Sequence, residues 1–405
     1  MKLPAQDKTI LKETNRKAIL NIFRNSEELT IFDLSKKINL SKPTLIEIIN
    51  YYLKKDLLVI AGKGESTYQG GKRPNIYKLN KDGGYAVGIT ISTIRVLAII
   101  INLRNEIVDE VSIPVVENEE FDSVFKKIID AYNYLLQKTK IKTAKIIGLA
   151  VGTYGITDYV KGTVLLSPRF PAWNKNIELV KELKEYIPHN IPVCIDNTIR
   201  FQVFAEKNLI PGNNVNDIVA LYSGNGMAAG VIIGNEIKRG NNSLIGEIGH
   251  MVVAPESKER CRCGGRGCFE VMVSPERVLR LVREKYNEYP DSIIFKSISP
   301  DQVDIYDVFK AADHGDNLAL AIMNEQIEWF VIGISNIILM YDPRLIIIGG
   351  VFTQAGNYFL ENLRNKINQI SLFSIKIETE IKYSVLDYKA GVLGAATFML
   401  VKFFK

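Results

Sequence analysis

Residues 85–116 read YAVGITISTIRVLAIIINLRNEIVDEVSIPVV and contain three β-rich runs joined by short turns. The runs are Tyr85–Ser92, Arg95–Leu103 and Glu106–Val116. Runs rich in β-branched residues and bounded by turn residues are typical of strands. We therefore predict a three-strand meander at the start of this region.

The segments after the meander alternate between helix and strand, and the same order recurs further along the chain. The first set is a helix at Phe121–Gln137, a strand at Lys145–Val151, a loop to Trp173, a helix at Ile177–Tyr186, a strand at Ile191–Ile195 and a helix at Thr198–Lys207. The second set has short strands at Asp217–Ser223, Ala228–Gly234 and Glu236–Arg239, helices at Pro275–Glu288, Ile305–Ala312 and Asn317–Tyr341, a strand at Arg344–Ile348, a helix at Ala355–Ile370, a strand at Ile375–Ile381 and a helix at Gly391–Phe404. The repeat predicts an α/β body of two similar lobes, residues 83–210 and 211–405, with a cleft between them of the kind that ligands favour.

Composition places the chain among globular proteins. Of 405 residues, 47% are hydrophobic and 24% are charged, close to globular averages. The longest purely apolar run, Val96–Ile101, has about six residues, whereas a membrane-spanning helix needs about 20. Because the N-terminus also lacks the apolar core of a secretory signal, we expect a cytoplasmic protein with no membrane partner.

Positive charge is concentrated in the first fifth of the chain. Residues 1–85 hold 16 basic and 9 acidic residues, whereas the other 320 hold 35 and 36. The same region predicts three helices, at Thr14–Arg24, at Ile31–Ile38 and after Ser41, followed by a hairpin of Leu57–Ile60 and Ile76–Leu79. This order is that of a winged helix-turn-helix, which we assign to residues 1–82. A lysine-rich solvated surface and a helical protein–protein adaptor are the alternatives.

In a helix-turn-helix the N-terminal residues of the second helix face base edges in the major groove of DNA. Ser41, Lys42, Pro43 and Thr44 would occupy that position. Lys72 and Arg73, at the base of the wing, would contact phosphate or the minor groove. Because one recognition helix reads only a half-site, we expect a homodimer or homotetramer on a palindromic operator.

Three of the four cysteines, Cys261, Cys263 and Cys268, lie within eight residues, eleven or more positions after His250. Three Cys and one His form a standard ligand set for structural zinc. Glycines at positions 264, 265 and 267 give the tight loop the backbone freedom that it needs. We expect a zinc site; free buried cysteines or a redox pair are the alternatives.

Two carboxylates flank this cluster. Glu247 lies in Gly246–His250, and Glu270 follows the last cysteine by two residues. Paired carboxylates on a rigid loop suit hydrogen bonding to vicinal sugar hydroxyls. The alternative is that both are solvated surface charges.

Taken together, Gly246–His250 and Cys261–Glu270 resemble the signature of the ROK family of sugar kinases and sugar-responsive repressors, and the resemblance covers essentially the whole chain. The repressor branch, which includes xylose repressors, has a winged helix-turn-helix before a body of actin-like sugar-kinase fold. The segment Gln69–Pro74 resembles that branch's junction between wing and body. The resemblance implies that His250, Cys261, Cys263 and Cys268 bind zinc, and that Asn197, Glu247, His250 and Glu270 contact a sugar.

The chain departs from ROK kinases where phosphoryl transfer is carried out. The kinases have a catalytic Asp where this chain has Thr198, whose hydroxyl cannot act as a general base near neutral pH; Asp196 could replace it only through a shift of register. The first phosphate loop, Thr90–Ile94, lacks the Asp and both glycines of the kinase motif. The second glycine loop, Gly224–Gly230, departs less.

The sequence therefore predicts a sugar-responsive transcriptional regulator without enzymatic activity, most simply a repressor whose lobes close around its inducer. The first alternative is an active ATP-dependent sugar kinase, such as a glucokinase or an N-acetylhexosamine kinase, with an accessory DNA-binding head. The second is a DNA-binding protein whose body is only a dimerisation scaffold.

Overall fold

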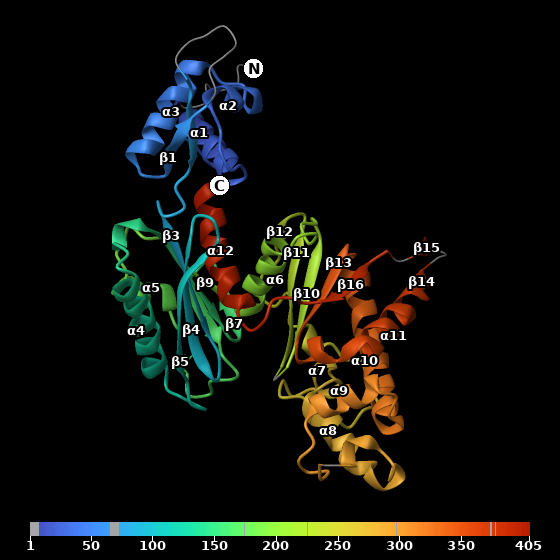
Figure 1. The fold of residues 1–405 in the computed structure, drawn as a ribbon. Helices are drawn as coiled ribbons and strands as arrows, with labels where there is room; N and C mark the ends of the chain where they lie inside the picture. Colours follow the sequence, from blue (N-terminus) through green and yellow to red (C-terminus); the bar gives the residue numbers. More distant parts are fainter. Residues whose placement is uncertain are drawn as a thin grey trace, which may run out of the picture. The chain divides into compact units, whose positions relative to one another are not determined.

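The computed structural model describes residues 8–64, 73–173, 175–224, 226–296, 298–372, 375–376 and 378–405 (Figure 1). It divides into two compact units. The first unit comprises the chain up to residue 198 together with residues 392–405, and the second comprises residues 199–391. The domain boundaries expected at residues 82 and 210 remain predictions.

The N-terminal head, in the first unit, consists of three helices and a β-hairpin. Its elements are α1 (Lys8–Arg24), α2 (Ile31–Lys37), α3 (Lys42–Lys54), β1 (Leu58–Lys63) and β2 (Asn75–Leu79). The two strands pair antiparallel, and the helices enclose a core that includes Ile19, Phe23, Leu34 and Leu45. This is the element order predicted for a winged helix-turn-helix.

Helices α2 and α3 of the head each begin at a side-chain cap. The Thr30 hydroxyl accepts a hydrogen bond from the Asp33 N–H, and the Asp33 carboxylate accepts one from the Thr30 N–H. Ser41 caps α3 by accepting from the Thr44 N–H, and Pro43 occupies the first turn. These bonds satisfy N–H groups that lack partners inside a helix, so they fix where α2 and α3 start.

The rest of the first unit, here called the first lobe, is built on a five-stranded sheet with strand order β5-β4-β3-β6-β9. Its elements are β3 (Tyr85–Ile91), β4 (Arg95–Asn102), β5 (Ile107–Pro114), α4 (Phe121–Thr139), β6 (Ile146–Thr153), β7 (Ile156–Asp158), β8 (Thr163–Leu166), α5 (Leu179–Lys184), β9 (Val193–Asn197) and the C-terminal helix α12 (Ala390–Phe404). The meander β3–β5 is antiparallel, whereas β6 and β9 join in parallel.

Helices cover both faces of this sheet. Figure 1 shows α4 and α5 on one face and α12 on the other. On the α4 side, Val87 and Ile89 of β3 pack with Val124 and Ile128. On the α12 side, the Cys194 sulfur in β9 lies 3.4 Å from the Met399 sulfur. Burial on both faces explains why β3, β4 and β6 are almost continuously apolar.

The second unit, here called the second lobe, repeats the same topology with strand order β12-β11-β10-β13-β16. Its strands are β10 (Ile218–Ser223), β11 (Met227–Ile233), β12 (Glu236–Ile237), β13 (Leu345–Gly350), β14 (Ser371–Leu372), β15 (Ile375–Lys376) and β16 (Glu380–Tyr383). Its helices are α6 (Thr198–Leu209, which starts one residue before the unit), α7 (Phe269–Met272), α8 (Pro275–Glu284), α9 (Ile305–Asp313), α10 (Asn317–Tyr341) and α11 (Gly356–Asn368). The repeat predicted from the sequence is confirmed.

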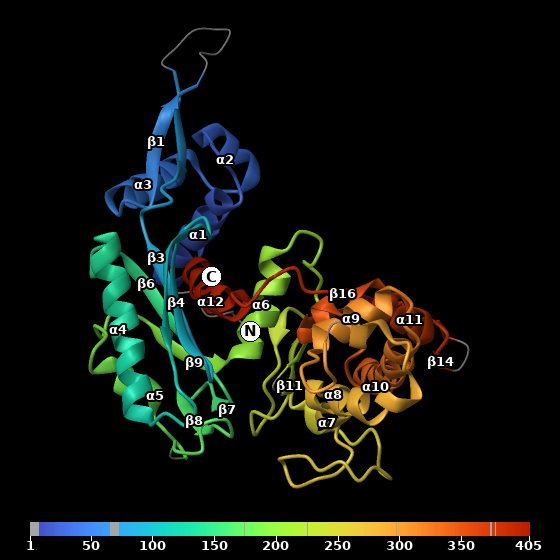
Figure 2. The same cartoon turned by 60° about the horizontal axis from the view of Figure 1, so that its bottom comes forward.

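Alternate residues of the second sheet face two cores. Val219 and Leu221 of β10 join the larger core, which includes α9, α10 and α11, whereas Ile218 and Ala220 pack with Val203 of α6. Figure 2 shows the helices from α8 to α11 gathered on one side of this sheet. Among the described residues, α10 is the one helix long and apolar enough to cross a membrane, yet half of that stretch is buried inside the protein, as in a core helix.

Two predicted segments contain different elements in the structure, and the first helix of the head begins at Lys8 rather than at Thr14. The loop expected up to Trp173 contains the hairpin of β7 and β8, whose strands of three and four residues are too short to give a clear period-2 pattern. The strand expected at Ile375–Ile381 is wrong as a single strand, since β15 pairs with β14 while β16 joins the main sheet.

Candidate functional site

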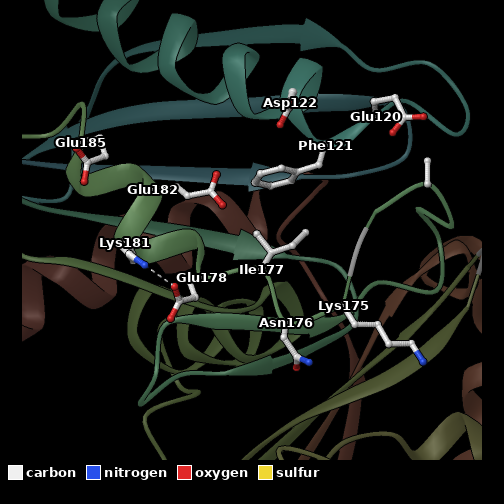
Figure 3. Close-up of a pocket in the computed structure, with 11 residues that line it drawn as sticks. Glu120, Phe121, Asp122, Lys175, Asn176, Ile177, Glu178, Lys181, Glu182 and Glu185 are labelled. Atoms are coloured by element: carbon white, nitrogen blue, oxygen red, sulfur yellow. Dashed lines mark hydrogen bonds and ion pairs between the residues drawn. The ribbon is translucent and has the colours of Figure 1, made fainter.

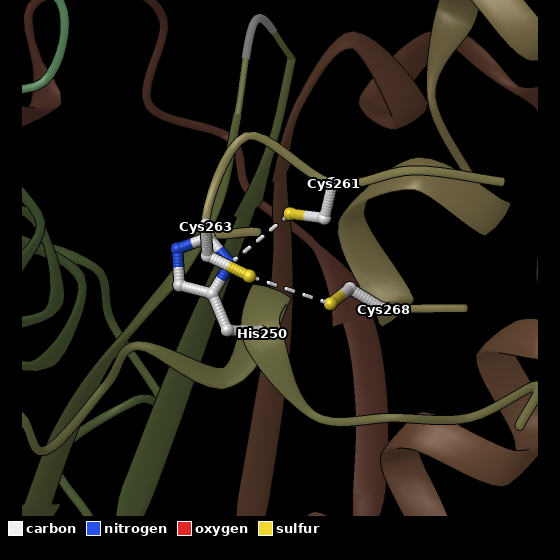
Figure 4. A group of neighbouring side chains, drawn as sticks. All are labelled: His250, Cys261, Cys263 and Cys268. Atoms are coloured by element: carbon white, nitrogen blue, oxygen red, sulfur yellow. Dashed lines mark hydrogen bonds between the residues drawn. The ribbon is translucent and has the colours of Figure 1, made fainter. Parts of the chain in front are cut away.

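The candidate metal centre lies in the second lobe, between β12 and α7 in the chain. One potential ligand atom from each of His250, Cys261, Cys263 and Cys268 lies within 4.8 Å of the others. The Cys261 sulfur lies 3.5 Å from His250 Nδ1, and the sulfurs of Cys263 and Cys268 are 3.7 Å apart (Figure 4). Tetrahedral zinc with Zn–S bonds of about 2.3 Å requires sulfurs about 3.8 Å apart. The four predicted ligands are thus together at a spacing that fits such an ion.

Short backbone pairings hold the two segments that carry these ligands. The Phe269 N–H donates to the Met251 carbonyl, and Val252 forms an isolated bridge with Cys268. Within the cysteine loop the Cys261 N–H donates to the Gly265 carbonyl. The loop therefore turns back so that Cys261 and Cys268 approach His250.

The protonation of the thiols depends on how deeply each is buried. Burial raises the pKa of Cys268 to about 12 and also raises the pKa of Cys261, whereas a backbone hydrogen bond from Gly265 lowers the pKa of the exposed Cys263. Metal binding requires thiolates. A bound cation would stabilise the thiolate forms of the two buried cysteines. The three sulfurs and one imidazole therefore suit a metal ion such as zinc.

The two carboxylates expected to contact a sugar lie beside this centre. Glu270, in the first turn of α7, accepts a hydrogen bond from the Met227 N–H at 2.9 Å. Burial raises the pKa of Glu247, while the positive charges of His250 and Arg200 lower it and Glu270 raises it further. Glu247 thus lies near enough to His250 and Glu270 to interact with both electrostatically.

His250 can serve the metal with one nitrogen and another ligand with the other. Its Nδ1 faces the Cys261 sulfur. Figure 4 shows the second ring nitrogen on the side away from the sulfurs. Since His250 is exposed, that nitrogen has room for a ligand.

Asn197, the fourth residue expected to contact a sugar, ends β9 in the first unit. Its side-chain amide donates to the Gly155 carbonyl at 2.8 Å. The neighbouring Thr198 hydroxyl donates to the Thr153 carbonyl at 3.2 Å. Asp196 is fully buried, and its carboxylate accepts a hydrogen bond from the Asn197 N–H.

The turn at Thr90–Ile94, which corresponds to the first phosphate loop of ROK kinases, is closed by its own side chain. The Ser92 hydroxyl donates to the Arg95 carbonyl at 2.9 Å and accepts from the Arg95 N–H at 3.1 Å. The turn links β3 directly to β4. The N–H groups of Ser92 and Arg95 are therefore occupied within a tight hairpin turn.

The residues expected to contact DNA lie at the start of α3 and beside the hairpin. Ser41, Lys42 and Pro43 are exposed and Thr44 is partly exposed. The hydroxyls of Ser41 and Thr44 lie 2.8 Å apart. Arg73 is exposed just before β2, whereas Lys72 lies outside the described residues.

The first lobe also has a surface hollow of about 540 Å³ between the start of α4 and α5 (Figure 3). Five carboxylates and two lysines line it, together with Phe121, Ala172, Asn176 and Ile177. Burial and the negative charges of Asp122 and Glu178 raise the pKa of Glu182. None of the residues that line the hollow is among those predicted to bind a sugar, a metal or DNA.

Two interactions that hold the site were not predicted from the sequence. Glu259 of the cysteine loop forms ion pairs with Arg277 and Arg280 of α8. Arg200, in the first turn of α6, donates to the carbonyls of Ser243 and Ile245. The helix dipole makes a cation unfavourable in the first turn of a helix. The position of Arg200 at the start of a predicted helix is therefore the feature of the sequence that could have drawn attention to it.

The chain combines a helix-turn-helix head, a duplicated sugar-kinase fold and a His/Cys₃ cluster in the second lobe. These features define it as a regulator-type member of the sugar-kinase fold class. The family model described as "ROK family" matches residues 86–402, and the chain belongs to that family.

The relatives include both branches of the family. A xylose repressor of Caldicellulosiruptor bescii is 27% identical over 392 residues, covering 97% of this chain and 96% of the relative. A glucokinase of Thermotoga maritima is 32% identical over 285 residues, covering 70% of this chain and 87% of the relative. A crystal structure of a ROK family transcriptional regulator, a homolog of the E. coli MLC protein, matches with a TM-score of 0.81 and 21% identity over 97% of both chains. The last comparison confirms the fold, including the head.

Proposed function

We propose that the protein is a sugar-responsive transcriptional repressor. The observation that carries the proposal is the combination of a helix-turn-helix head with a sugar-kinase fold in one chain, matched over nearly its full length by xylose repressors. The matched glucokinase covers only 70% of the chain. The basic head supports DNA as the partner, because Lys and Arg that neutralise phosphates supply most non-specific affinity for DNA.

Phosphoryl transfer is not part of the proposed function. Transfer requires a base, Mg²⁺ ligands and a phosphate cradle together. The base position is Thr198, whose hydroxyl donates to a carbonyl, and the turn at Ser92 is closed on itself. Both observations favour a protein that binds a sugar without phosphorylating it.

In the proposed complex, α3 lies in the major groove with Ser41, Lys42, Pro43 and Thr44 toward the bases, and Lys72 and Arg73 contact the backbone. A homodimer or homotetramer would present two heads to a palindromic operator. Closure of the lobes on the sugar would change operator affinity. The oligomeric state, the closure and a cytoplasmic location remain predictions from the sequence.

The proposed inducer is an aldose whose vicinal hydroxyls donate to Glu247 and Glu270 and accept from His250. Asn197 is proposed as a further contact from the first lobe. The proposed metal is structural zinc, held by His250, Cys261, Cys263 and Cys268. Through His250 the ion would hold a residue that contacts the sugar, so we expect inducer binding to depend on zinc.

Calorimetry combined with a coupled ATPase assay tests this function. Zinc-loaded protein is titrated with D-xylose, D-glucose and N-acetyl-D-glucosamine, and ATP hydrolysis is measured with each sugar. We expect binding of at least one sugar, lost in Glu247→Ala, with no sugar-dependent hydrolysis. Hydrolysis that depends on both the sugar and Glu247 would instead identify a kinase. Absence of any sugar binding would favour a dimerisation scaffold.

A further inference from the structure

Arg200 is a buried cation whose place in the fold needs an explanation. It is 2% exposed and is among the largest fully buried side chains of the described residues. Its Nη2 donates to the Ser243 carbonyl at 2.7 Å and to the Ile245 carbonyl at 3.4 Å. Burying a guanidinium is costly, and the dipole of α6 opposes a cation in the first turn. The bonds that Arg200 makes must offset both costs.

The segment that Arg200 holds, residues 243–247, leads directly into Glu247. Ser243 has a φ of 58°, a conformation that costs free energy in a residue other than glycine and persists only where the surroundings hold it. Gly246 has a φ of 102°, which glycine adopts readily. On the side of β11, the Gly246 carbonyl accepts a hydrogen bond from the Ala229 N–H at 2.7 Å. A Cβ at Gly246 would lie 2.0 Å from the Ala229 oxygen, so this contact tolerates no side chain. Strand β11 and Arg200 thus fix the segment at separate points.

Each group expected to contact the sugar from the second lobe therefore has its own support. Glu270 is held by the Met227 N–H. His250 is held by the cysteine cluster. Glu247 follows directly on the segment that Arg200 holds. Displacing that segment would move Glu247 relative to the other two groups.

We propose that Arg200 is a positioning residue for sugar binding: by holding the carbonyls of Ser243 and Ile245, it places Glu247 for a hydrogen bond to a sugar hydroxyl. It does not itself contact the sugar. This inference rests on the proposed function, because it assigns a role only if Glu247 binds a sugar.

The same helix provides a matched control. Lys207 is also a buried cation of α6, 6% exposed, and it donates to the Asn214 side chain and the Val215 carbonyl. Asn214 and Val215 belong to a loop that contains no residue predicted to bind the sugar or the metal. Replacing Lys207 removes a buried cation and its bonds to a loop, as replacing Arg200 does, but leaves the segment before Glu247 intact.

The experiment compares Arg200→Met, Arg200→Lys and Lys207→Met with wild type, all as full-length, zinc-loaded protein. Calorimetry with D-xylose, D-glucose and N-acetyl-D-glucosamine gives sugar affinity, while zinc content and the midpoint of thermal unfolding report the integrity of the fold. Both Met variants should unfold at lower temperature and keep the zinc content of wild type. Only Arg200→Met should bind the sugar more weakly, by about tenfold or more, since the bonds from a charged donor to the Ser243 and Ile245 carbonyls are lost. Arg200→Lys, which keeps a donor, should recover part of the affinity.

The positioning role would be overturned if the sugar affinities of Arg200→Met and Lys207→Met were within about twofold of each other. If Arg200→Met does not fold, the same comparison is made between Arg200→Lys and Lys207→Met, with weaker binding expected only for the former. Wild-type protein that binds none of the sugars would refute the proposed function, and this inference with it. If wild-type protein binds a sugar and the Arg200 variants bind it equally well, this inference alone is refuted.

Discussion

Cys263 differs from the other cysteines of the cluster because it is exposed while Cys261 and Cys268 are buried. The residue types and their spacing were sufficient to predict which four side chains would meet. The support around them was not predictable: Arg277, Arg280 and Glu259 pair across segments that are separated by a turn and a helix. Charged residues of this kind look the same in sequence whether they are solvated or paired.

Replacing Cys263 with Ser should remove the metal. Zinc binds poorly when one of four ligands is lost, and we expect its affinity to fall at least about 100-fold, with inducer binding lost as well. Metal content per chain after dialysis against a chelator measures this. Cys194→Ser, in β9 of the first unit, should retain zinc. A Cys263→Ser protein that keeps the metal content of wild type would show that the ligand set is wrong.

Individual elements were predicted well where the chain has long periodic or β-rich runs, as for α10, whose bounds match the prediction. They were missed where strands are very short, as in β7 and β8. The starts of helices depended on caps that can be read from sequence, such as Thr30 and Ser41. The start of α4 is supported differently, by the buried Glu119 just before it.

Glu119 makes the start of α4 sensitive to acid. Burial raises the pKa of Glu119, but hydrogen bonds from Lys127, Ser123 and the Val116 N–H outweigh it and bring the pKa to about 2. Because the folded-state pKa lies below the unfolded value, this carboxylate stabilises the protein above about pH 4.5, and that contribution is lost as pH falls toward 2.

Glu119→Gln should therefore lower the free energy of unfolding near pH 7 by roughly 2 kcal/mol, and the difference from wild type should shrink as the solution is acidified. Urea unfolding at a series of pH values measures both. Glu120→Gln, at the exposed neighbour, should behave as wild type. Parallel stability curves for wild type and Glu119→Gln would contradict the assignment.

Contacts of the head with phosphate should appear in the salt dependence of DNA binding. Each lost phosphate contact is expected to lower the slope of log affinity against log salt concentration by about one. We predict this reduction for Lys72→Ala and for Arg73→Ala, measured by fluorescence anisotropy. Lys161→Ala, at an exposed lysine of the first lobe, should leave the slope unchanged. Unchanged slopes for both head variants would place the DNA contacts elsewhere.

At the scale of the whole molecule, the duplicated body and the head were predictable because each lobe carries the same order of strands and helices. The return of α12 to the first unit was not predictable, since a helix that follows the last strand of the second lobe in sequence gives no local sign of the sheet that it covers. Arg200 was missed for a related reason: its partners, Ser243 and Ile245, are more than forty residues away in the chain.

Sugar-dependent release of DNA is the behaviour that distinguishes a sugar-responsive repressor from a kinase or a scaffold. Zinc-loaded full-length protein is bound to a labelled fragment of the DNA flanking its own gene, and anisotropy is followed as D-xylose, D-glucose or N-acetyl-D-glucosamine is added. We expect at least one sugar to weaken DNA binding by about tenfold or more, because an inducer must bind one of the two states more tightly. We expect Glu247→Ala to bind DNA normally but not to respond to the sugar. DNA affinity that no sugar changes, or a response that persists in Glu247→Ala, would contradict the proposed function.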